Sequence, residues 1–169
     1  MLMCARRRGR GVTLIELLIT VAVVSIALSL AAPSMSTQIA NYRVRSATDS
    51  ILGGLSLART EAVRRNSAVR FTLNAGSSAW TVAQVSPSTT IQSRAAAENA
   101  GVTTTSGNTA WSVTFNPTGM VDTSSAWLGH ITVSSSARHT DSRQIDIMGG
   151  GLVRSCDPAA TGSNDPRRC

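Results

Sequence analysis

The feature that most constrains this chain is an apolar run over residues 12–32, in which Glu16 is the single charged residue. A helix of this length can cross the ~30 Å hydrocarbon core of a bilayer, so the run predicts a membrane-spanning helix. Four arginines precede it, all within the first ten residues (Arg6, Arg7, Arg8 and Arg10). Because basic residues stay on the cytoplasmic side of a membrane, we expect a cytoplasmic N-terminus and an exported C-terminal part.

Glu16 lies five residues past Gly11, near the start of this run. A carboxylate in a membrane helix is costly to bury and commonly has a function or a partner. The alternative is that Glu16 sits at the level of the lipid headgroups and is only solvated. A secretory signal has a shorter apolar core that ends at a small-residue cleavage site. Here the apolar run is long and leads into further helical sequence.

The net charge of +7 comes largely from the first ten residues, because removing their four arginines leaves 12 basic and 9 acidic residues. The bulk charge is therefore a weak argument for nucleic-acid binding. No arrangement typical of an enzyme is present. The histidines, His130 and His139, have no Cys or carboxylate at metal-ligand spacing. We expect no enzymatic activity, cofactor, metal or small-molecule substrate.

Beyond Pro33 the apolar residues recur at spacings of three and four, which predicts a helix with one apolar face. Those residues are Val44, Ala47, Ile51, Leu55, Ala58 and Ala62. We expect one helix from about residue 13 to about residue 65, with its second half packed on a sheet. Pro33 lacks an N–H group and is expected to kink the helix or open it locally.

The remaining sequence changes to an alternating pattern, which predicts strands of an antiparallel sheet. These strands are expected at residues 68–73, 80–85, 112–115, 130–133 and 143–147. Residues 74–78 are expected to form a hairpin loop and residues 116–119 a turn. The Ser/Thr-rich stretch 86–110 shows little periodicity and is expected to be a long surface loop. The pattern predicts an α+β fold.

Cys156 and Cys169 lie within the last 14 residues. Such a pair predicts a disulfide that closes the C-terminal tail in an oxidising compartment. The alternative is two free thiols in a reducing cytoplasm.

The sequence Arg-Gly-Arg-Gly11 followed by Val-Thr-Leu-Ile-Glu16 resembles the type III leader of type IV pilins and pseudopilins. The resemblance implies that prepilin peptidase cuts after Gly11 and that Val12 becomes the methylated N-terminus. It also makes Glu16 and Pro33 filament-assembly positions. The first mature residue in that family is usually Phe, whereas here it is Val12.

Physical chemistry supplies a role for Glu16 in such a filament. A buried carboxylate needs a cation, and the α-amino group at Val12 of a neighbouring subunit is the natural one. That pairing would set the axial register of an incoming subunit.

Two further stretches, residues 57–66 and 113–119, resemble the GspH/FimT group of minor pseudopilins. The resemblance implies a type IV pilin-like fold with three parts. These are a cleaved leader over residues 1–11, a transmembrane and filament-core helix over 12–33, and a periplasmic globular domain over 34–169.

Some FimT-type pilins bind DNA through a Gly-Arg-x-Arg motif near the C-terminus, and the matching stretch here is Gly151-Leu-Val-Arg154, without the first Arg. The candidate phosphate contacts are Arg143, Arg154, Arg167 and Arg168. The alternative is solvated surface charge. Residues 128–169 contain no aromatic residue, so any DNA contact there is expected to reach the backbone alone.

The resemblance implies a minor pseudopilin or minor pilin, anchored in the bacterial inner membrane with its C-terminal domain in the periplasm. It would serve either the pseudopilus of a type II secretion system or a type IV pilus. The second hypothesis is a DNA-binding minor pilin in natural transformation. The expected partners are the inner membrane, prepilin peptidase, other major and minor pilins, and, in the second hypothesis, DNA.

Overall fold

The structure is a computed structural model that describes residues 12–137, 140–162 and 164–169, without the side chains of residues 30–34. The chain divides into two compact units, Met1–Ser36 and Thr37–Cys169. Helix α1 (Leu14–Arg65) begins in the first unit and ends in the second, close to the predicted bounds.

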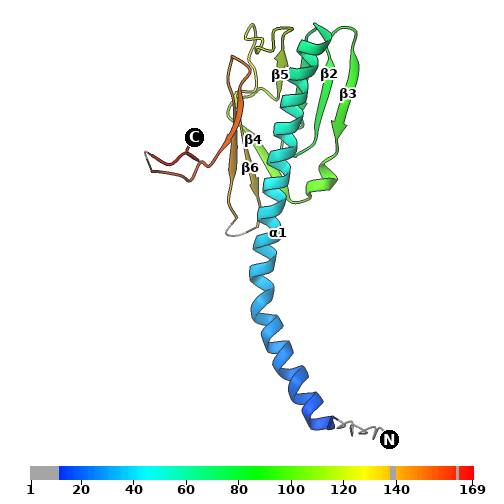
Figure 1. The fold of residues 1–169 in the computed structure, drawn as a ribbon, viewed down its shortest axis with the longest axis vertical. Coiled ribbons are helices and arrows are strands. Elements are labelled where there is room, and N and C mark those ends of the chain that lie inside the picture. The colour runs from blue at the N-terminus through cyan, green and yellow to red at the C-terminus, as the bar shows by residue number, and fades with distance from the viewer. Residues whose placement is uncertain (1–11, 138–139, 163) are drawn as a thin grey trace, which may run out of the picture. The chain divides into compact units, whose positions relative to one another are not determined.

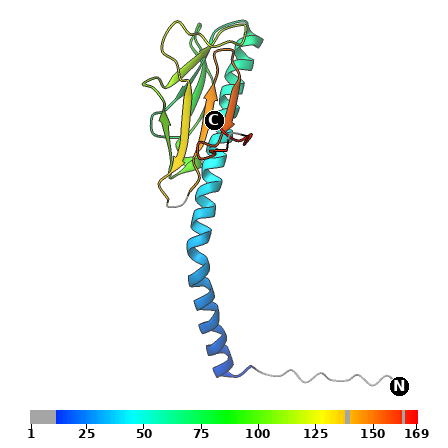
Figure 2. The same cartoon turned by 90° about the vertical axis from the view of Figure 1, so that its left-hand side faces the viewer.

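The second unit contains two four-stranded antiparallel sheets (Figures 1 and 2). The first has the order β3-β2-β1-β5, with bounds Thr89–Arg94, Trp80–Gln84, Val69–Leu73 and Ser112–Phe115. The second has the order β4-β6-β7-β8, with bounds Val102–Ser106, His130–Ser135, Arg143–Ile147 and Val153–Cys156. The prediction of a helix packed on antiparallel strands is confirmed, with two sheets in place of one.

The prediction of a long surface loop over residues 86–110 is wrong. This stretch contains β3, a short 3₁₀-helix (Ala96–Asn99) and β4. Strand β3 is an edge strand with mostly exposed side chains, so it lacks an apolar alternation. In β4, Thr104 occupies a buried position and donates a hydrogen bond from its hydroxyl to the Ser77 carbonyl at 2.7 Å. A hydrogen-bonded threonine therefore occupies an inward-facing position at which an alternating strand pattern would have an apolar residue. Strand β8 was also not predicted.

One face of α1 forms the centre of the core within the second unit. All six residues of the predicted apolar face are buried there, each at most 1% exposed (Val44, Ala47, Ile51, Leu55, Ala58 and Ala62). They belong to one hydrophobic cluster with side chains from both sheets, such as Phe71 and Ile131. The periodicity of α1 is therefore confirmed as the packing face.

Gly54 permits the closest approach between α1 and the first sheet. A Cβ atom at this position would lie 2.9 Å from Cε2 of Phe71 and 3.0 Å from Cδ2 of Trp80. The indole nitrogen of Trp80 also donates a hydrogen bond to the Ser50 hydroxyl at 2.9 Å, which fixes the ring against the helix. The neighbouring Gly53 is exposed, and a Cβ there would meet nothing within 4 Å.

We therefore expect opposite effects from Gly53→Ala and Gly54→Ala. Alanine favours a helix over glycine by about 1 kcal/mol, so Gly53→Ala should raise the free energy of unfolding by roughly 0.5–1 kcal/mol. Gly54→Ala gains the same propensity but crowds two buried rings, and overpacking costs about 1–3 kcal/mol. We expect it to lower the free energy of unfolding by about 1–2 kcal/mol. Denaturant titration of both variants tests this, and equal stability of the two would contradict the close packing.

Helix α1 ends in a charged cluster. The guanidinium groups of Arg64 and Arg65 bind the Glu61 carboxylate at 2.7 and 2.6 Å, and the Glu61 side chain is only 11% exposed. Hydrogen bonds from Arg64 and then Arg65 lower the pKa of Glu61 from 4.5 to about 2. The next residue, Asn66, has a φ of 48°, the left-handed conformation that commonly terminates a helix.

This cluster should make stability depend on pH. Because the folded-state pKa of Glu61 is lowered, its contribution is complete above pH 4.5 and is lost as the pH falls toward about 2. Glu61→Gln removes the carboxylate, so the variant should lose less stability than the wild type across that window. Thermal unfolding at several pH values between 5 and 2 measures the difference. Parallel curves for the two proteins would show that Glu61 does not carry this dependence.

Candidate functional site

The first unit presents an apolar helix surface. From Val12 to Leu28 the large apolar side chains are exposed, from 54% at Val24 to 82% at Leu14. Three hydroxyl side chains of this segment bond to the helix backbone. The hydroxyls of Thr20, Ser25 and Ser29 donate hydrogen bonds to carbonyls three residues earlier, at 2.8, 2.8 and 2.7 Å. The surface of this segment is therefore suited to an apolar environment.

Thr13 and Glu16 organise the start of α1. The Thr13 hydroxyl accepts a hydrogen bond from the backbone N–H of Glu16 at 3.3 Å, as an N-cap residue does. The spacing Thr-x-x-Glu is that of a capping box, a signal that the sequence reasoning missed. Within the described residues, no hydrogen bond or ion pair reaches the Glu16 carboxylate.

The other expected N-terminal site residues are placed only in part. Gly11, the expected cleavage position, lies outside the described residues. Val12 is 70% exposed. Pro33 lies within α1, and its side chain is not described. Among the helices of the described residues, none combines the length and the apolarity that crossing a membrane requires.

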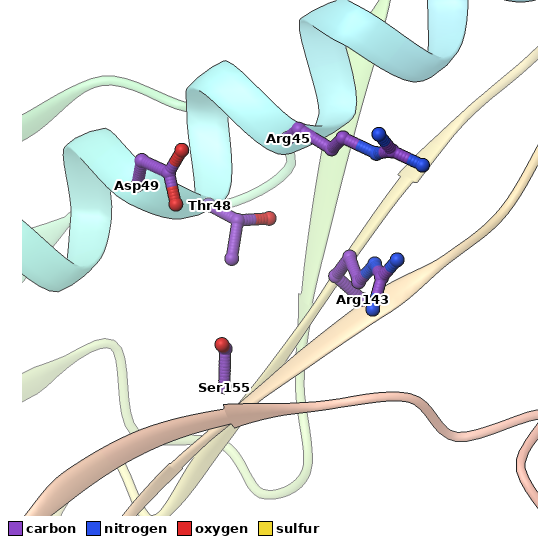
Figure 3. Close-up of a pocket in the computed structure, with 5 residues that line it drawn as sticks. All are labelled: Arg45, Thr48, Asp49, Arg143 and Ser155. Carbon is purple, nitrogen blue, oxygen red and sulfur yellow. The ribbon is translucent and has the colours of Figure 1, made fainter. Parts of the chain in front are cut away.

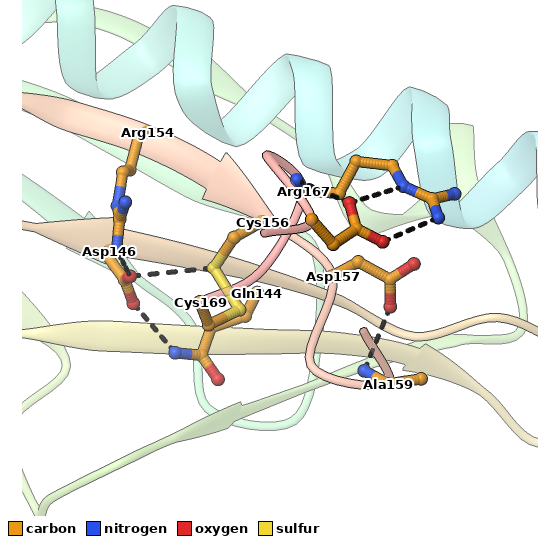
Figure 4. Close-up of a disulfide and its surroundings, with 9 residues drawn as sticks. Gln144, Asp146, Arg154, Cys156, Asp157, Ala159, Arg167 and Cys169 are labelled. Atoms are coloured by element: carbon orange, nitrogen blue, oxygen red, sulfur yellow. Dashed lines mark hydrogen bonds and ion pairs between the residues drawn. A yellow bond between two sulfur atoms is a disulfide. The ribbon is translucent and has the colours of Figure 1, made fainter. Parts of the chain in front are cut away.

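The expected disulfide is present between Cys156 and Cys169 (Figure 4). Cys156 ends β8 and is 4% exposed, so the bond ties the last residues of the chain to the second sheet. Inside the closed tail, the backbone N–H of Asp157 donates to the carbonyl of Arg167 at 2.6 Å. The disulfide therefore ties the tail to the sheet, and the hydrogen bond closes the tail on the residue that follows β8.

Two of the four candidate DNA-contacting arginines already have acidic partners. Arg154 binds Asp146 at 3.2 Å, and Arg167 binds Asp165 at 2.8 Å (Figure 4 shows both arginines). The hydrogen bonds from Arg167 lower the pKa of Asp165 to about 2, so this carboxylate is charged at any physiological pH. These pairs reduce the positive field that a DNA backbone would meet.

The guanidinium groups of the other two candidates, Arg143 and Arg168, make no hydrogen bond or ion pair with any described residue. Arg168 is exposed in the C-terminal tail. Arg143, on β7, lines a surface depression together with Arg45 of α1. The sequence reasoning did not single out Arg45. Its position off the apolar face of α1 was the one available signal.

In the part of the chain that the structure covers, no cluster of three or more His, Cys, Asp or Glu residues is placed to hold a metal ion. His130 is exposed at the start of β6, and His139 lies outside the described residues.

The two stretches at residues 57–66 and 113–119 meet at the end of α1. The guanidinium Nε of Arg59 donates a hydrogen bond to the Gly119 carbonyl at 3.1 Å. Gly119 has a φ of +80° and closes a turn in which its N–H donates to the Asn116 carbonyl at 2.9 Å. These residues therefore serve to join the helix to the turn after β5.

Helix α1 begins with an exposed apolar surface, and its second half packs on antiparallel sheets. This arrangement defines a type IV pilin-like protein. The sequence matches the family described as type II transport protein GspH over residues 47–151, and the prokaryotic N-terminal methylation motif over residues 6–32. Since the first match spans more than half of the chain, the protein belongs to the GspH family. The proteins that it matches are structural pilins rather than enzymes.

Solved structures show the same fold. Two crystal forms of the type IV minor pilin FimU from Pseudomonas aeruginosa PAO1 are similar to this chain. The first has 15% identity and a TM-score of 0.55, covering 66% of this chain and 86% of FimU. The second has 14% identity and a TM-score of 0.54, covering 70% of this chain and 97% of FimU. At these identities the likeness concerns the fold alone. A comparison with curated proteins finds no match.

Proposed function

We propose that this protein is a minor pseudopilin of a type II secretion system, cut after Gly11 by prepilin peptidase and methylated at Val12. The mature chain would consist of a membrane and filament-core helix over residues 12–33 and a periplasmic domain over residues 34–169. The observation that carries the proposal is the Glu16 carboxylate, without a partner among the described residues, on a helix whose apolar side chains are exposed. The family description favours a secretion system over a type IV pilus.

In this proposal the subunit waits in the inner membrane and then joins a filament of other pilins. The apolar side chains of α1 exchange lipid for neighbouring helices, so close packing between the helices supplies the stability. Glu16 binds the α-amino group of a neighbour's Val12, which fixes the axial position of the subunit. Pro33 would mark the end of the filament-core segment.

Mass spectrometry of the membrane-extracted protein tests the maturation step. The expected mass begins at Val12 and includes one methyl group. A mass that retains Met1, or that begins near Ala32, excludes the proposal.

The assembly step is tested with Glu16→Gln, which keeps the shape of the side chain and removes its charge. The variant should be cut normally but should be recovered in the membrane fraction rather than with sheared filaments. Ser25→Ala is a matched control, because the Ser25 hydroxyl bonds only to its own helix. Normal incorporation of Glu16→Gln would contradict the pairing.

The choice of machine is tested by deleting the gene and scoring exoprotein secretion, surface piliation and transformation. We expect secretion to fall and transformation to persist. The ion pairs of Arg154 and Arg167 argue against the DNA hypothesis. If DNA is the ligand, replacing Arg154, Arg167 and Arg168 together should flatten the salt dependence of duplex binding by about 3 units.

A further inference from the structure

Most arginines in the described residues have an acceptor within the chain. They bind carbonyls, a hydroxyl or carboxylates, as Arg43, Arg59, Arg64, Arg65, Arg70, Arg94, Arg154 and Arg167 do. The guanidinium groups of three arginines have no acceptor among the described residues: Arg45, Arg143 and Arg168. Two of these three, Arg45 and Arg143, lie at the same place on the surface.

Arg45 and Arg143 come from different elements, α1 and β7, and line one depression in the second unit with Thr48, Asp49 and Ser155. Figure 3 shows the two guanidinium groups on one side of the depression and the Asp49 carboxylate on the other. Asp49 makes no ion pair with either arginine.

A guanidinium group carries a fixed positive charge in proteins. Two such groups that line one depression attract an anion that can accept hydrogen bonds from both. The planar forks of two arginines match the oxygens of a carboxylate or a phosphate.

The opposite side of the depression favours the carboxylate. The Asp49 carboxylate faces the same space, and its repulsion is about twice as large for a dianionic phosphate as for a monoanionic carboxylate. The Ser155 hydroxyl lines the depression and offers one further donor.

We propose that the depression between α1 and β7–β8 is a docking site for an acidic side chain of a neighbouring pilin, whose carboxylate binds Arg45 and Arg143. This inference rests on the proposed function for the identity of the partner, but the carboxylate-binding site itself does not. The proposed site gives the second unit a lateral contact with a neighbouring pilin, separate from the pairing of Glu16 with Val12.

The binding site is tested on the purified full-length chain in detergent. Glutarate and inorganic phosphate are the probes, and the NMR signals of the arginine Nε–H groups are followed. Glutarate should shift the signals of Arg45 and Arg143 together, with one dissociation constant. Arg45→Gln or Arg143→Gln should weaken glutarate binding about tenfold or more, as expected for a lost charge-assisted hydrogen bond. Arg168→Gln is the matched control, because it removes an unpaired charge elsewhere, and it should change binding less than twofold.

Three results would overturn the site. They are the absence of a shift at Arg45 and Arg143, equal shifts at Arg168, or binding of phosphate at least ten times tighter than that of glutarate. Arg45→Lys and Arg143→Lys guard against an indirect effect, since they keep the charge and lose the planar fork. These variants should recover part of the affinity.

The partner is tested in cells with a photo-reactive amino acid at Ser155. The cross-linked peptide should come from another pilin, should contain Asp or Glu, and should disappear with Arg45→Gln. A cross-link to lipid or nucleic acid, or to a pilin segment without an acidic residue, excludes the proposed partner. The proposed function fails separately, through a mass that does not begin at Val12.

Discussion

Gly151→Ala should lower the free energy of unfolding by about 3 kcal/mol or more. Gly151 has a φ of +81°, where an L-residue costs about 1–2 kcal/mol relative to glycine. A Cβ atom there would also lie 2.0 Å from the Gly119 carbonyl oxygen, which is backbone and cannot rotate away. The Gly119 carbonyl accepts the hydrogen bond of Arg59, so the displacement would also loosen the end of α1.

Gly150→Ala is the control for this substitution. A Cβ atom at Gly150 would meet nothing within 4 Å, so its effect should stay within about 0.5 kcal/mol. Denaturant titration followed by the fluorescence of the buried Trp80 measures both variants. Equal stability of Gly151→Ala and Gly150→Ala would contradict the close contact between the turns that contain Gly119 and Gly151.

Removing the disulfide by Cys156→Ala with Cys169→Ala should lower the free energy of unfolding by about 3 kcal/mol. The bond joins residues 13 positions apart, and closing a loop of this length in the unfolded chain accounts for that value in the chain-entropy model. Cys156 is buried on β8, so the loss should also release the tail from the second sheet. Reduction of the wild-type protein should produce the same shift.

The double variant provides the control, because a reductant should not change its unfolding curve. Protease digestion supplies an independent measurement. The tail after Asp157 should be cut faster in the variant than in the oxidised wild type. Identical unfolding of the oxidised and reduced wild type would contradict a stabilising role for the bond.

Features set by local spacing could be predicted from the sequence. The apolar face of α1 follows from a period of three to four residues, and the tail disulfide from two cysteines close in the chain. Strand β4 could not be predicted, because Thr104 is buried with a hydrogen bond to Ser77, a partner 27 residues away in the sequence. A polar residue gives no sign in the sequence that such a partner exists.

The depression lined by Arg45 and Arg143 also depends on residues that are distant in the sequence. Arg45 and Arg143 come together because α1 packs across the second sheet, and neither residue has a local motif. The contact of Gly119 with Gly151 arises in the same way, from two turns brought to one end of α1. The capping spacing of Thr13 and Glu16, in contrast, was readable and was missed.

The inward hydroxyls of Thr20, Ser25 and Ser29 have a consequence for the transfer of a subunit between surroundings. Because each hydroxyl is already bonded to its own helix, the proposed transfer of the segment from lipid to the interior of a filament would break none of these three hydrogen bonds. The exchange replaces one apolar neighbour with another, which makes it close to reversible for this part of α1. Within this segment, the direction of the transfer would then be decided by the pairing of the Glu16 carboxylate with the α-amino group of a neighbour's Val12.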